Sequence, residues 1–519
     1  MSAPAPSTGQ PRIRVIFGAL MLVILLAALD QTIVATALPT IVGELGGLQH
    51  LAWVITAYLL ASTVTGPIYG KLGDLYGRKI VLQTAIVIFL VGSALCGIAQ
   101  GMTELIVFRA VQGLGAGGLM VTTIAVVGDI IPPRDRGKYQ GLFGAVFGVS
   151  TVIGPLLGGF FVDNLSWRWI FYVNLPLGAL ALFVIGTVFR SRAEHVRHSI
   201  DYLGAATLSG GLTGIVLFTS LGGTTEAWGS AQSVALAVVG VALLVVFLFV
   251  ERRAAEPILP LELFRNRTFA VTSAIGFIIG LSLFGSVTYL PLFLQIVKGK
   301  SPTASGLVLT PMMAGLLVTS VVAGRTISRI GRYRPFPIIG TALMTVGMVL
   351  LSQLDRQSSI LYAAAGMLVV GLGLGMVMQV LVLAVQNAVD FRVMGVATSG
   401  SVLFRQIGGS IGLAIFGSIF ANSLHAKLAA YLPPGAHPAK SVSPAVVKRL
   451  PPAVHDAYVR AVAGSLHPVF VTAAAIGTVA FLLTWLLHDI PLGTTSRATL
   501  RREEAAAAAA AAAEGTLPT

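Results

Sequence analysis

Apolar stretches of about 20 residues recur along the whole chain, and short segments that carry most of the charged residues separate them. A helix that spans the hydrocarbon core of a bilayer needs roughly 20 mostly apolar residues, so each stretch predicts one transmembrane helix. The pattern predicts fourteen helices, at residues 14–38, 51–70, 80–100, 104–127, 139–161, 169–190, 201–221, 232–250, 268–294, 303–325, 335–353, 359–387, 394–420 and 467–487. An even number of crossings places both termini on the same side of the membrane.

The composition supports an integral membrane protein. Of the 519 residues, 55% are hydrophobic and only 10% are charged, with a mean hydropathy of +0.87, whereas soluble proteins carry roughly 25% charged residues. The net charge of +14 would suggest a nucleic-acid partner in a soluble protein. Here Lys and Arg concentrate in alternate loops, as they do on the cytoplasmic side of membrane proteins. We therefore expect cytoplasmic termini and no nucleic-acid partner.

A short motif occurs twice and indicates an internal repeat. Residues 70–79 read GKLGDLYGRK after the second predicted helix, and residues 324–332 read GRTISRIGR after the tenth. Ser328 stands where the first copy has Asp74, so the second copy has the weaker charge network. Parallel repeats of six helices build the major facilitator transporters. The repeat therefore indicates two six-helix halves with two extra helices between them.

This organisation divides the chain into five parts. They are a cytoplasmic N-terminus (1–13), an N-terminal six-helix bundle (14–190), two inserted helices with their linkers (191–267), a C-terminal six-helix bundle (268–488) and a cytoplasmic alanine-rich tail (489–519). Within the C-terminal bundle, residues 421–466 are expected to form a long external loop. Cys96 is the single cysteine, so neither an intramolecular disulfide nor a cysteine-based metal site is possible.

Five motifs resemble those of one transporter family. Residues 70–79 are similar to the loop signature of major facilitator transporters, and residues 29–39 (LDQTIVATALP) resemble the first-helix motif of fourteen-helix drug:proton antiporters of the EmrB/QacA type. Residues 109–115, 154–159 and 167–176 are similar to the motifs of helices four, five and six. The motifs occur in the expected order along the chain. This resemblance implies an all-α integral membrane protein with the major facilitator fold, built from two six-helix bundles plus two linker helices.

Asp30 is the one acidic residue among twenty that lies well inside a predicted membrane helix. A charge at bilayer depth costs roughly 2.5–3.5 kcal/mol on insertion scales, so such residues normally face a cavity and have a function. Arg109, in the fourth predicted helix, is the expected partner, because an opposite charge stabilises the carboxylate. We predict that Asp30 and Arg109 couple transport to protons. A structural Asp30 held by Thr32, and an Arg109 that bonds a backbone carbonyl, are the alternatives.

A charge cluster and a glycine-rich helix are the next candidates. The resemblance implies that Asp74, Arg78 and Asp129 form a cytoplasmic cluster that stabilises one conformation. Asp74 could also face the N-terminus of the predicted thirteenth helix, where the helix dipole favours negative charge. The resemblance further implies that the small residues of the fifth helix set the cavity shape and limit proton leak, with plain helix packing as the alternative; they are Gly154, Pro155, Gly158 and Gly159.

A pocket for drug-like molecules needs apolar and aromatic walls with a few polar anchors. The candidates are Trp53, Tyr58, Gln112, Tyr289, Gln379, Asn387 and Arg405. The resemblance implies that predicted helices nine and twelve line the cavity, which favours Tyr289 and Gln379 among the candidates. Simple packing is the alternative for most of them. Arg405 could face the cavity or an inner gate, and a bond to backbone carbonyls or snorkelling is its alternative. The thirteenth predicted helix contains no acid, which argues against recognition of dications.

The motif content excludes most enzymes. The sequence has no P-loop, no HExxH motif and no nucleophile elbow, so we expect neither catalysis nor ATP as an energy source. We expect a monomeric, proton-driven antiporter without a bound cofactor or metal, which exports amphipathic or cationic drug-like molecules across a bacterial plasma membrane. Export of an endogenous lipid or secondary metabolite by the same machinery is the alternative. A receptor or scaffold is disfavoured, because it has no need of buried charges.

Overall fold

The computed structural model describes residues 10–45, 51–189, 201–222, 228–287, 289–300, 305, 308–433, 447 and 450–493. Residues 1–9 of the N-terminus and 494–519 of the alanine-rich tail lie outside the described residues. Within the described part, the chain is helical and contains no β-strand, as the hydropathy pattern predicts.

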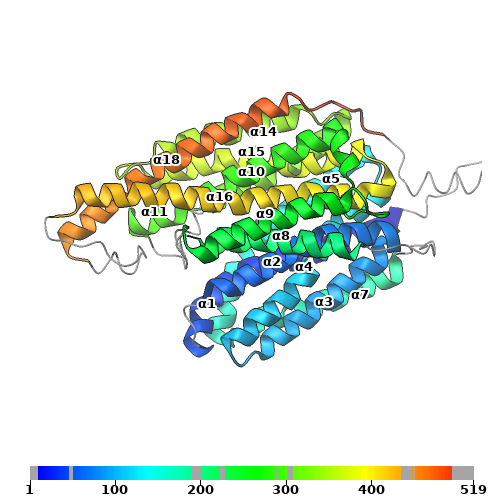
Figure 1. The fold of residues 1–519 in the computed structure, drawn as a ribbon, viewed down its shortest axis with the longest axis horizontal. Coiled ribbons are helices and arrows are strands. Elements are labelled where there is room, and N and C mark those ends of the chain that lie inside the picture. Colours follow the sequence, from blue (N-terminus) through cyan, green and yellow to red (C-terminus); the bar gives the residue numbers. More distant parts are fainter. Residues whose placement is uncertain are drawn as a thin grey trace, which may run out of the picture.

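Helices α1 to α7 form the N-terminal half (Figure 1). Their bounds are α1 Gln10–Leu45, α2 Leu51–Tyr76, α3 Arg78–Ile98, α4 Met102–Ile130, α5 Pro133–Asn164, α6 Trp169–Tyr172 and α7 Asn174–Val188. Two helices follow, α8 Tyr202–Leu221 and α9 Ala231–Glu251. The C-terminal half contains η2 Leu261–Arg265, α10 Arg267–Val287, α11 Leu290–Ile296, α13 Thr310–Ile330, α14 Pro335–Ser352, α15 Ile360–Ala388, η3 Phe391–Val393, α16 Met394–Tyr431 and α18 Pro452–Thr484.

Twelve helical stretches of the described residues are long and apolar enough to cross a membrane. Helices α2 and α10 are not among them, so length and hydropathy do not confirm the predicted fourteen. Helix α2 contains several Ser, Thr and Gly residues and Pro67, which lower its hydropathy, and α10 is represented by a shorter apolar stretch, Arg267–Ser282. Both helices nevertheless pack inside the bundles, α2 against α4 and α10 against α16.

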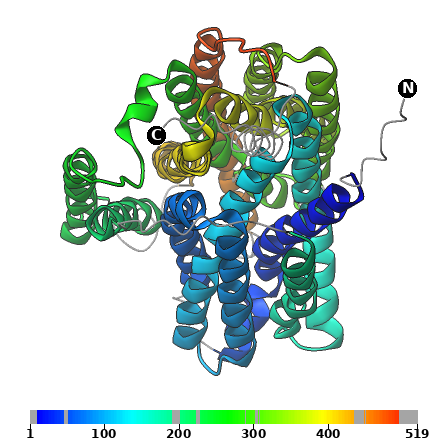
Figure 2. The same ribbon diagram turned by 90° about the vertical axis from the view of Figure 1, so that its right-hand side faces the viewer.

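The two halves lie side by side, and α8 and α9 form a pair at one edge of the molecule (Figure 2). Helix α8 packs against α9, and it also contacts α2 of the N-terminal half and α16 of the C-terminal half. The inserted pair therefore rests on both halves rather than on one.

Close contact between the halves is made where α5 crosses α13. A Cβ atom at Gly141 of α5 would overlap the carbonyl oxygen of Ser320, and one at Gly324 of α13 would overlap the Gly137 carbonyl. At the same end, a side chain on Gly70 of α2 would overlap Ser399 of α16. Small residues allow such backbone approach between membrane helices. The halves are therefore closed against each other at the end that holds the turn between α2 and α3.

Two predicted boundaries differ from the structure. The predicted helix at 268–294 is divided into α10 and α11, and most of the predicted external loop at 421–466 is helical. Helix α16 continues to Tyr431 and α18 begins at Pro452, while residues 434–446 and 448–449 lie outside the described residues. The sequence prediction followed apolar length, but a helix continues past an apolar stretch wherever its backbone hydrogen bonds are satisfied internally.

Candidate functional site

The carboxylate of Asp30 lies at the centre of a polar network inside the N-terminal half. The residue is completely buried in α1. Arg109 Nη1 donates to Asp30 Oδ2 at 2.7 Å, while Gln112 Nε2 and Asn174 Nδ2 donate to Oδ1 at 2.8 Å and 3.1 Å. Helices α1, α4 and α7 therefore meet at one carboxylate. Three donors, one of them charged, compensate for the loss of water around it.

The guanidinium of Arg109 has further partners. Besides Asp30, it donates to Gln112 Oε1 at 2.6 Å and from Nε to the Val54 carbonyl oxygen at 3.3 Å. The face of the Tyr58 ring lies 4.1 Å from the guanidinium carbon, which adds a cation–π contact. Tyr58 is buried and lies beside this charge. The structure thus places Tyr58 next to the ion pair.

A second layer of polar groups holds the amides that contact Asp30. The Ser93 hydroxyl accepts from Gln112 Nε2 at 3.1 Å and from Asn174 Nδ2 at 2.9 Å, and it donates to the Phe171 carbonyl oxygen. A Cβ atom at Gly92 would overlap the backbone of Gln112, so this glycine lets α3 approach α4 closely enough to place Ser93.

The role expected for Gln112 requires correction. Its side chain bonds Asp30, Arg109 and Ser93 and is completely buried, so it belongs to the charge network and does not line a substrate wall. The sequence reasoning did not single out Ser93 and Asn174. Asn174 could have been identified from the sequence, because it is an amide within an apolar stretch of the motif at 167–176.

Glu44, at the last turn of α1, contacts the start of the motif at 167–176. Arg168 Nη1 donates to Glu44 Oε1 at 2.6 Å and Trp167 Nε1 donates to Oε2 at 2.7 Å. The hydrogen bond from Arg168 is the main cause that lowers the pKa of Glu44 below its usual value. These contacts tie the end of α1 to the segment that leads into α7, and so fix Asn174 relative to Asp30.

Two glycines of α5 allow α1 to pack closely against α5, at a point two residues from Asp30. Thr32 Oγ1 donates to the Ser150 carbonyl oxygen at 3.0 Å. Cβ atoms at Gly154 and Gly158 would overlap the hydroxyls of Thr32 and Thr36, whereas one at Gly159 would meet nothing within 4 Å. Close packing therefore requires the first two glycines but not Gly159. Pro155 lies inside the helix and its side chain is exposed.

The charge cluster connects the two halves at their closed end. Arg78 forms ion pairs with Asp74 and, at 3.2 Å, with Asp129. The carboxylate of Asp74 also accepts from the backbone nitrogens of Gly395 at 3.1 Å and Val396 at 2.9 Å, in the first turn of α16. A negative charge at a helix N-terminus is stabilised by the helix dipole. The predicted proximity of Asp74 to this helix is therefore present in the structure.

The remaining substrate candidates do not converge on one pocket. Trp53 is partly exposed near the start of α2, and Tyr289 packs on the Phe420 ring at a centroid distance of 4.9 Å. Asn387 Nδ2 donates to the Ile490 carbonyl oxygen at 3.2 Å, so it fastens the chain after α18 to the end of α15. Arg405, on α16, is partly exposed.

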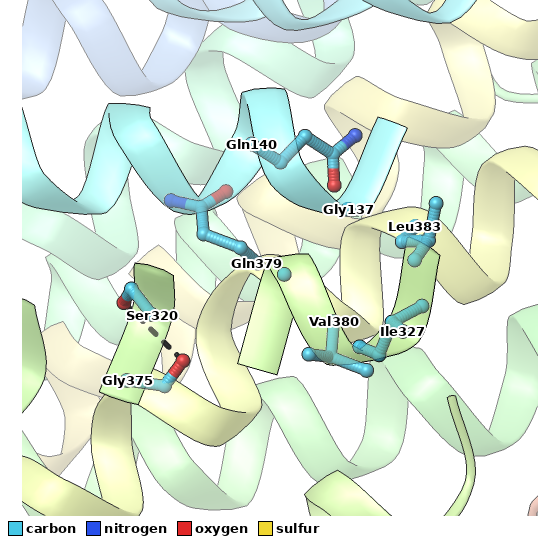
Figure 3. Close-up of a pocket in the computed structure, with 9 residues that line it drawn as sticks. Gly137, Gln140, Ser320, Ile327, Gly375, Gln379, Val380 and Leu383 are labelled. Atoms are coloured by element: carbon cyan, nitrogen blue, oxygen red, sulfur yellow. Dashed lines mark hydrogen bonds between the residues drawn. The ribbon is translucent and has the colours of Figure 1, made fainter. Parts of the chain in front are cut away.

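Gln379 lines a small cavity between α5, α13 and α15 at the closed end (Figure 3). The residues around it are Gly137, Gln140, Ser320, Gly324, Ile327, Gly375, Gln379, Val380 and Leu383. Across the same interface, Gln140 Nε2 donates to Gln386 Oε1 at 2.9 Å. The cavity is too small for a drug-like molecule. Gln379 therefore lies at the interface between the halves in this structure, and its role in a substrate pocket stays a prediction.

The two helical halves, their close contacts at glycines and the bonds of Asp74 to α16 agree with a comparison of the sequence with known families. Residues 20–413 match the Major Facilitator Superfamily. The chain belongs to the major facilitator superfamily. It is therefore a multi-pass membrane transporter rather than an enzyme, as the sequence analysis predicts at this level.

Relatives in this superfamily give further information on the kind of transport and on the membrane. An uncharacterized MFS-type transporter of Mycobacterium tuberculosis is 46% identical over 491 residues, which cover 94% of this chain and 72% of the relative. The multidrug transporter protein MdtP of Bacillus subtilis is 39% identical over 501 residues, covering 91% of this chain and 92% of MdtP. Such relatives support an efflux transporter, and their bacterial origin suggests the plasma membrane.

Solved structures support the fold alone. A double-tryptophan mutant of the xylose transporter XylE superimposes with a TM-score of 0.64 at 15% identity, over 93% of this chain and 97% of XylE. At that identity, the agreement shows that the helices are arranged as in other members of the major facilitator superfamily and carries no information on substrate.

A Gly158→Ala substitution should destabilise the protein, because its Cβ would overlap the Thr36 hydroxyl. Overpacking of this kind costs about 1–3 kcal/mol. Gly159→Ala is the matched control, since it adds the same methyl group in open space on the same helix. Thermal unfolding of the purified variants in detergent checks the difference. Equal stability of the two variants would contradict the close packing of α1 on α5.

Removal of one partner of the buried ion pair should destabilise the protein more than removal of both. We expect Arg109→Gln to lower the free energy of unfolding by about 3–5 kcal/mol, because Asp30 is left as an uncompensated buried charge. The double variant Asp30→Asn, Arg109→Gln should recover part of this loss. Denaturant unfolding measures the coupling, and Arg325→Gln, at an exposed position, is the control. Strictly additive effects would mean that the two charges do not stabilise each other.

Proposed function

We propose that this transporter exports amphipathic organic molecules in exchange for protons, with Asp30 as the proton carrier. The observation that supports this most directly is the burial of Asp30 in a complete hydrogen-bond shell with Arg109. A buried ion pair of this kind adds little stability compared with well-packed apolar residues, so a role in transport explains its presence better than a role in folding.

Protonation of Asp30 would remove the negative charge that Arg109 faces. The guanidinium would then be a buried cation without a counter-ion, which is costly enough to favour a rearrangement of α4 against α1. Helix α1 packs against α5 through Thr32 and at Gly158. Helix α5 in turn packs on α13 of the other half through Gly141. A change in charge at Asp30 can thus reach the interface between the halves through two direct helix contacts.

The closed end of the molecule fits one state of an alternating-access cycle. Asp74 holds the first turn of α16 through two backbone hydrogen bonds, and α5 meets α13 at the same end. Opening this end requires that Asp74 give up both bonds. We propose that the cluster of Asp74, Arg78 and Asp129 stabilises this closed state, and that protonation and substrate binding shift the balance between the closed and open states.

For topology, we propose fourteen membrane helices with both termini in the cytoplasm, as in antiporters of the EmrB/QacA type. Helix α2 has 26 residues and α10 has 21, which correspond to about 39 Å and 31 Å of helix at 1.5 Å per residue. Both lengths reach across a hydrocarbon core of about 30 Å. Addition of these two helices to the twelve apolar ones gives fourteen. We propose that the protein is a monomer in the bacterial plasma membrane.

For the substrate, the network around Asp30 favours amphipathic molecules without requiring a cation. The carboxylate is already occupied by Arg109, Gln112 and Asn174, so in this state it offers no free negative charge to a cationic substrate. Multidrug relatives such as MdtP support a broad range of cargo for this chain.

Asp30→Asn should abolish proton-driven transport, because the amide cannot carry the proton. Uptake of two amphipathic dyes, the cation ethidium and the anion fluorescein, into inverted membrane vesicles, with the proton gradient imposed and then collapsed, measures this. We expect the gradient-dependent rate of uptake to fall at least about tenfold, which corresponds to an increase of about 1.36 kcal/mol in the activation free energy. Asp163→Asn, at an exposed position on α5, should transport like the wild type. Gradient-driven uptake by Asp30→Asn at the wild-type rate would eliminate Asp30 as the carrier.

A further inference from the structure

Arg109, within α4, and Arg136, in the first turn of α5, are buried arginines with several hydrogen-bond partners each. Arg109 has Asp30, Gln112 and a backbone carbonyl. Arg136, on α5, is completely buried and donates to the backbone carbonyl oxygens of three residues. These oxygens belong to Ile131 at 3.0 Å, Gln386 at 3.2 Å and Gly128 at 2.5 Å.

Arg405 differs from both. Among the residues that the structure describes, it has no hydrogen-bond acceptor and no ion-pair partner. It lies on α16 eleven positions after the helix begins at Met394, about 17 Å along the helix axis. A guanidinium presents five N–H donors and keeps its charge at any physiological pH. A partly exposed position at this depth therefore leaves a cation that lacks a counter-ion within the protein.

The C-terminal half supplies no acid that could neutralise this charge. Its acidic residues in the described part lie at helix ends or between helices: Glu262, Asp355, Asp390, Asp456 and Asp489. The buried acid of the N-terminal half, Asp30, is paired with Arg109. The membrane interior of this protein thus contains a balanced pair in one half and an unbalanced positive charge in the other.

Arg405 lies on α16, a helix of the C-terminal half that also contacts α2 and α4 of the N-terminal half. Its backbone is held against α10, because a Cβ atom at Gly280 would overlap the Arg405 carbonyl oxygen. Leu403 and Ile407, two positions before and after Arg405, share a hydrophobic cluster with Val64 of α2. Residues two positions apart point to opposite faces of a helix, so the partly exposed Arg405 side chain lies on the face of α16 away from this cluster. An ionisable residue within a membrane helix normally faces the bundle interior or a water-filled cavity.

We propose that Arg405 binds an anionic group of the exported molecule, so that the preferred cargo is an amphipathic carboxylate, sulfonate or phosphate. This proposal rests on the proposed function as an exporter and names its substrate class. The planar guanidinium bonds two oxygens of such a group at once, which a point charge cannot do. A cation is disfavoured, because Arg405 repels it and Asp30 is occupied.

Equilibrium binding of two xanthene dyes of opposite charge tests the proposal. Fluorescein is an anion and rhodamine 123 is a cation, and their ring systems are similar in size. We expect Arg405→Gln to raise the dissociation constant for fluorescein at least about tenfold, a change of 1.4 kcal/mol, and to leave unchanged or lower that for rhodamine 123, because the substitution removes a positive charge that repels this dye. Arg405→Lys should fall between wild type and Arg405→Gln, because it keeps the charge but not the bidentate geometry. Arg325→Gln, at an exposed position, is the control for a simple change in net charge.

The measurement is made by fluorescence anisotropy on purified protein in phosphatidylcholine nanodiscs, without a proton gradient. A second set of nanodiscs that contain phosphatidylglycerol distinguishes a lipid headgroup from a soluble anion: competition with fluorescein on wild type, but not on Arg405→Gln, identifies the lipid phosphate as the bound anion. Equal fluorescein affinity in wild type and Arg405→Gln, or an equal loss for both dyes, would overturn the proposal. Because no gradient is present, a failure of proton coupling leaves this result unaffected.

Discussion

The buried ion pair between Asp30 and Arg109 is the interaction on which the N-terminal half depends. Two opposite charges at this depth are tolerated only when their remaining lone pairs and protons are also satisfied. Gln112, Asn174 and Ser93 meet that requirement, and each comes from a helix that has to be placed to within hydrogen-bond distance of the carboxylate. The packing of α3, α4 and α7 around α1 follows from this condition as much as from apolar contact.

Small residues on α5 allow this helix to pack closely both against α1, which carries Asp30, and against the opposite half. Gly158 and Gly154 bring α5 against α1 beside Thr32, and Gly141, further along α5, brings it against α13. One helix therefore carries both contacts, with the proton site on one side and the opposite half on the other. Side chains at these positions would separate the helices, so the glycines are needed for contact and not for backbone freedom.

The two halves share an architecture but differ in charge. The N-terminal half encloses a balanced pair, and its Asp74 closes one end of the molecule by accepting two backbone hydrogen bonds from α16. In the C-terminal half the matching loop has Ser328 instead of an acid, and Arg405 has no hydrogen-bond or ion-pair partner among the described residues. This asymmetry assigns the proton to one half and the charge of the cargo to the other, in the proposed cycle.

The sequence by itself determined that the chain is helical, lies in a membrane and consists of two related halves, because apolar length and the repeated motif are properties of consecutive residues. It also singled out Asp30 and Arg109, since charged residues inside apolar stretches are visible without a structure. Only the tertiary structure decided which groups complete their shell, that Gln112 belongs to it, that Gln379 and Asn387 lie at interfaces, and that Gly159 has no packing partner. These facts depend on distances between helices that are far apart in the sequence. Hydropathy does not reveal these distances, because it records how apolar a segment is and not which of its faces contacts another helix.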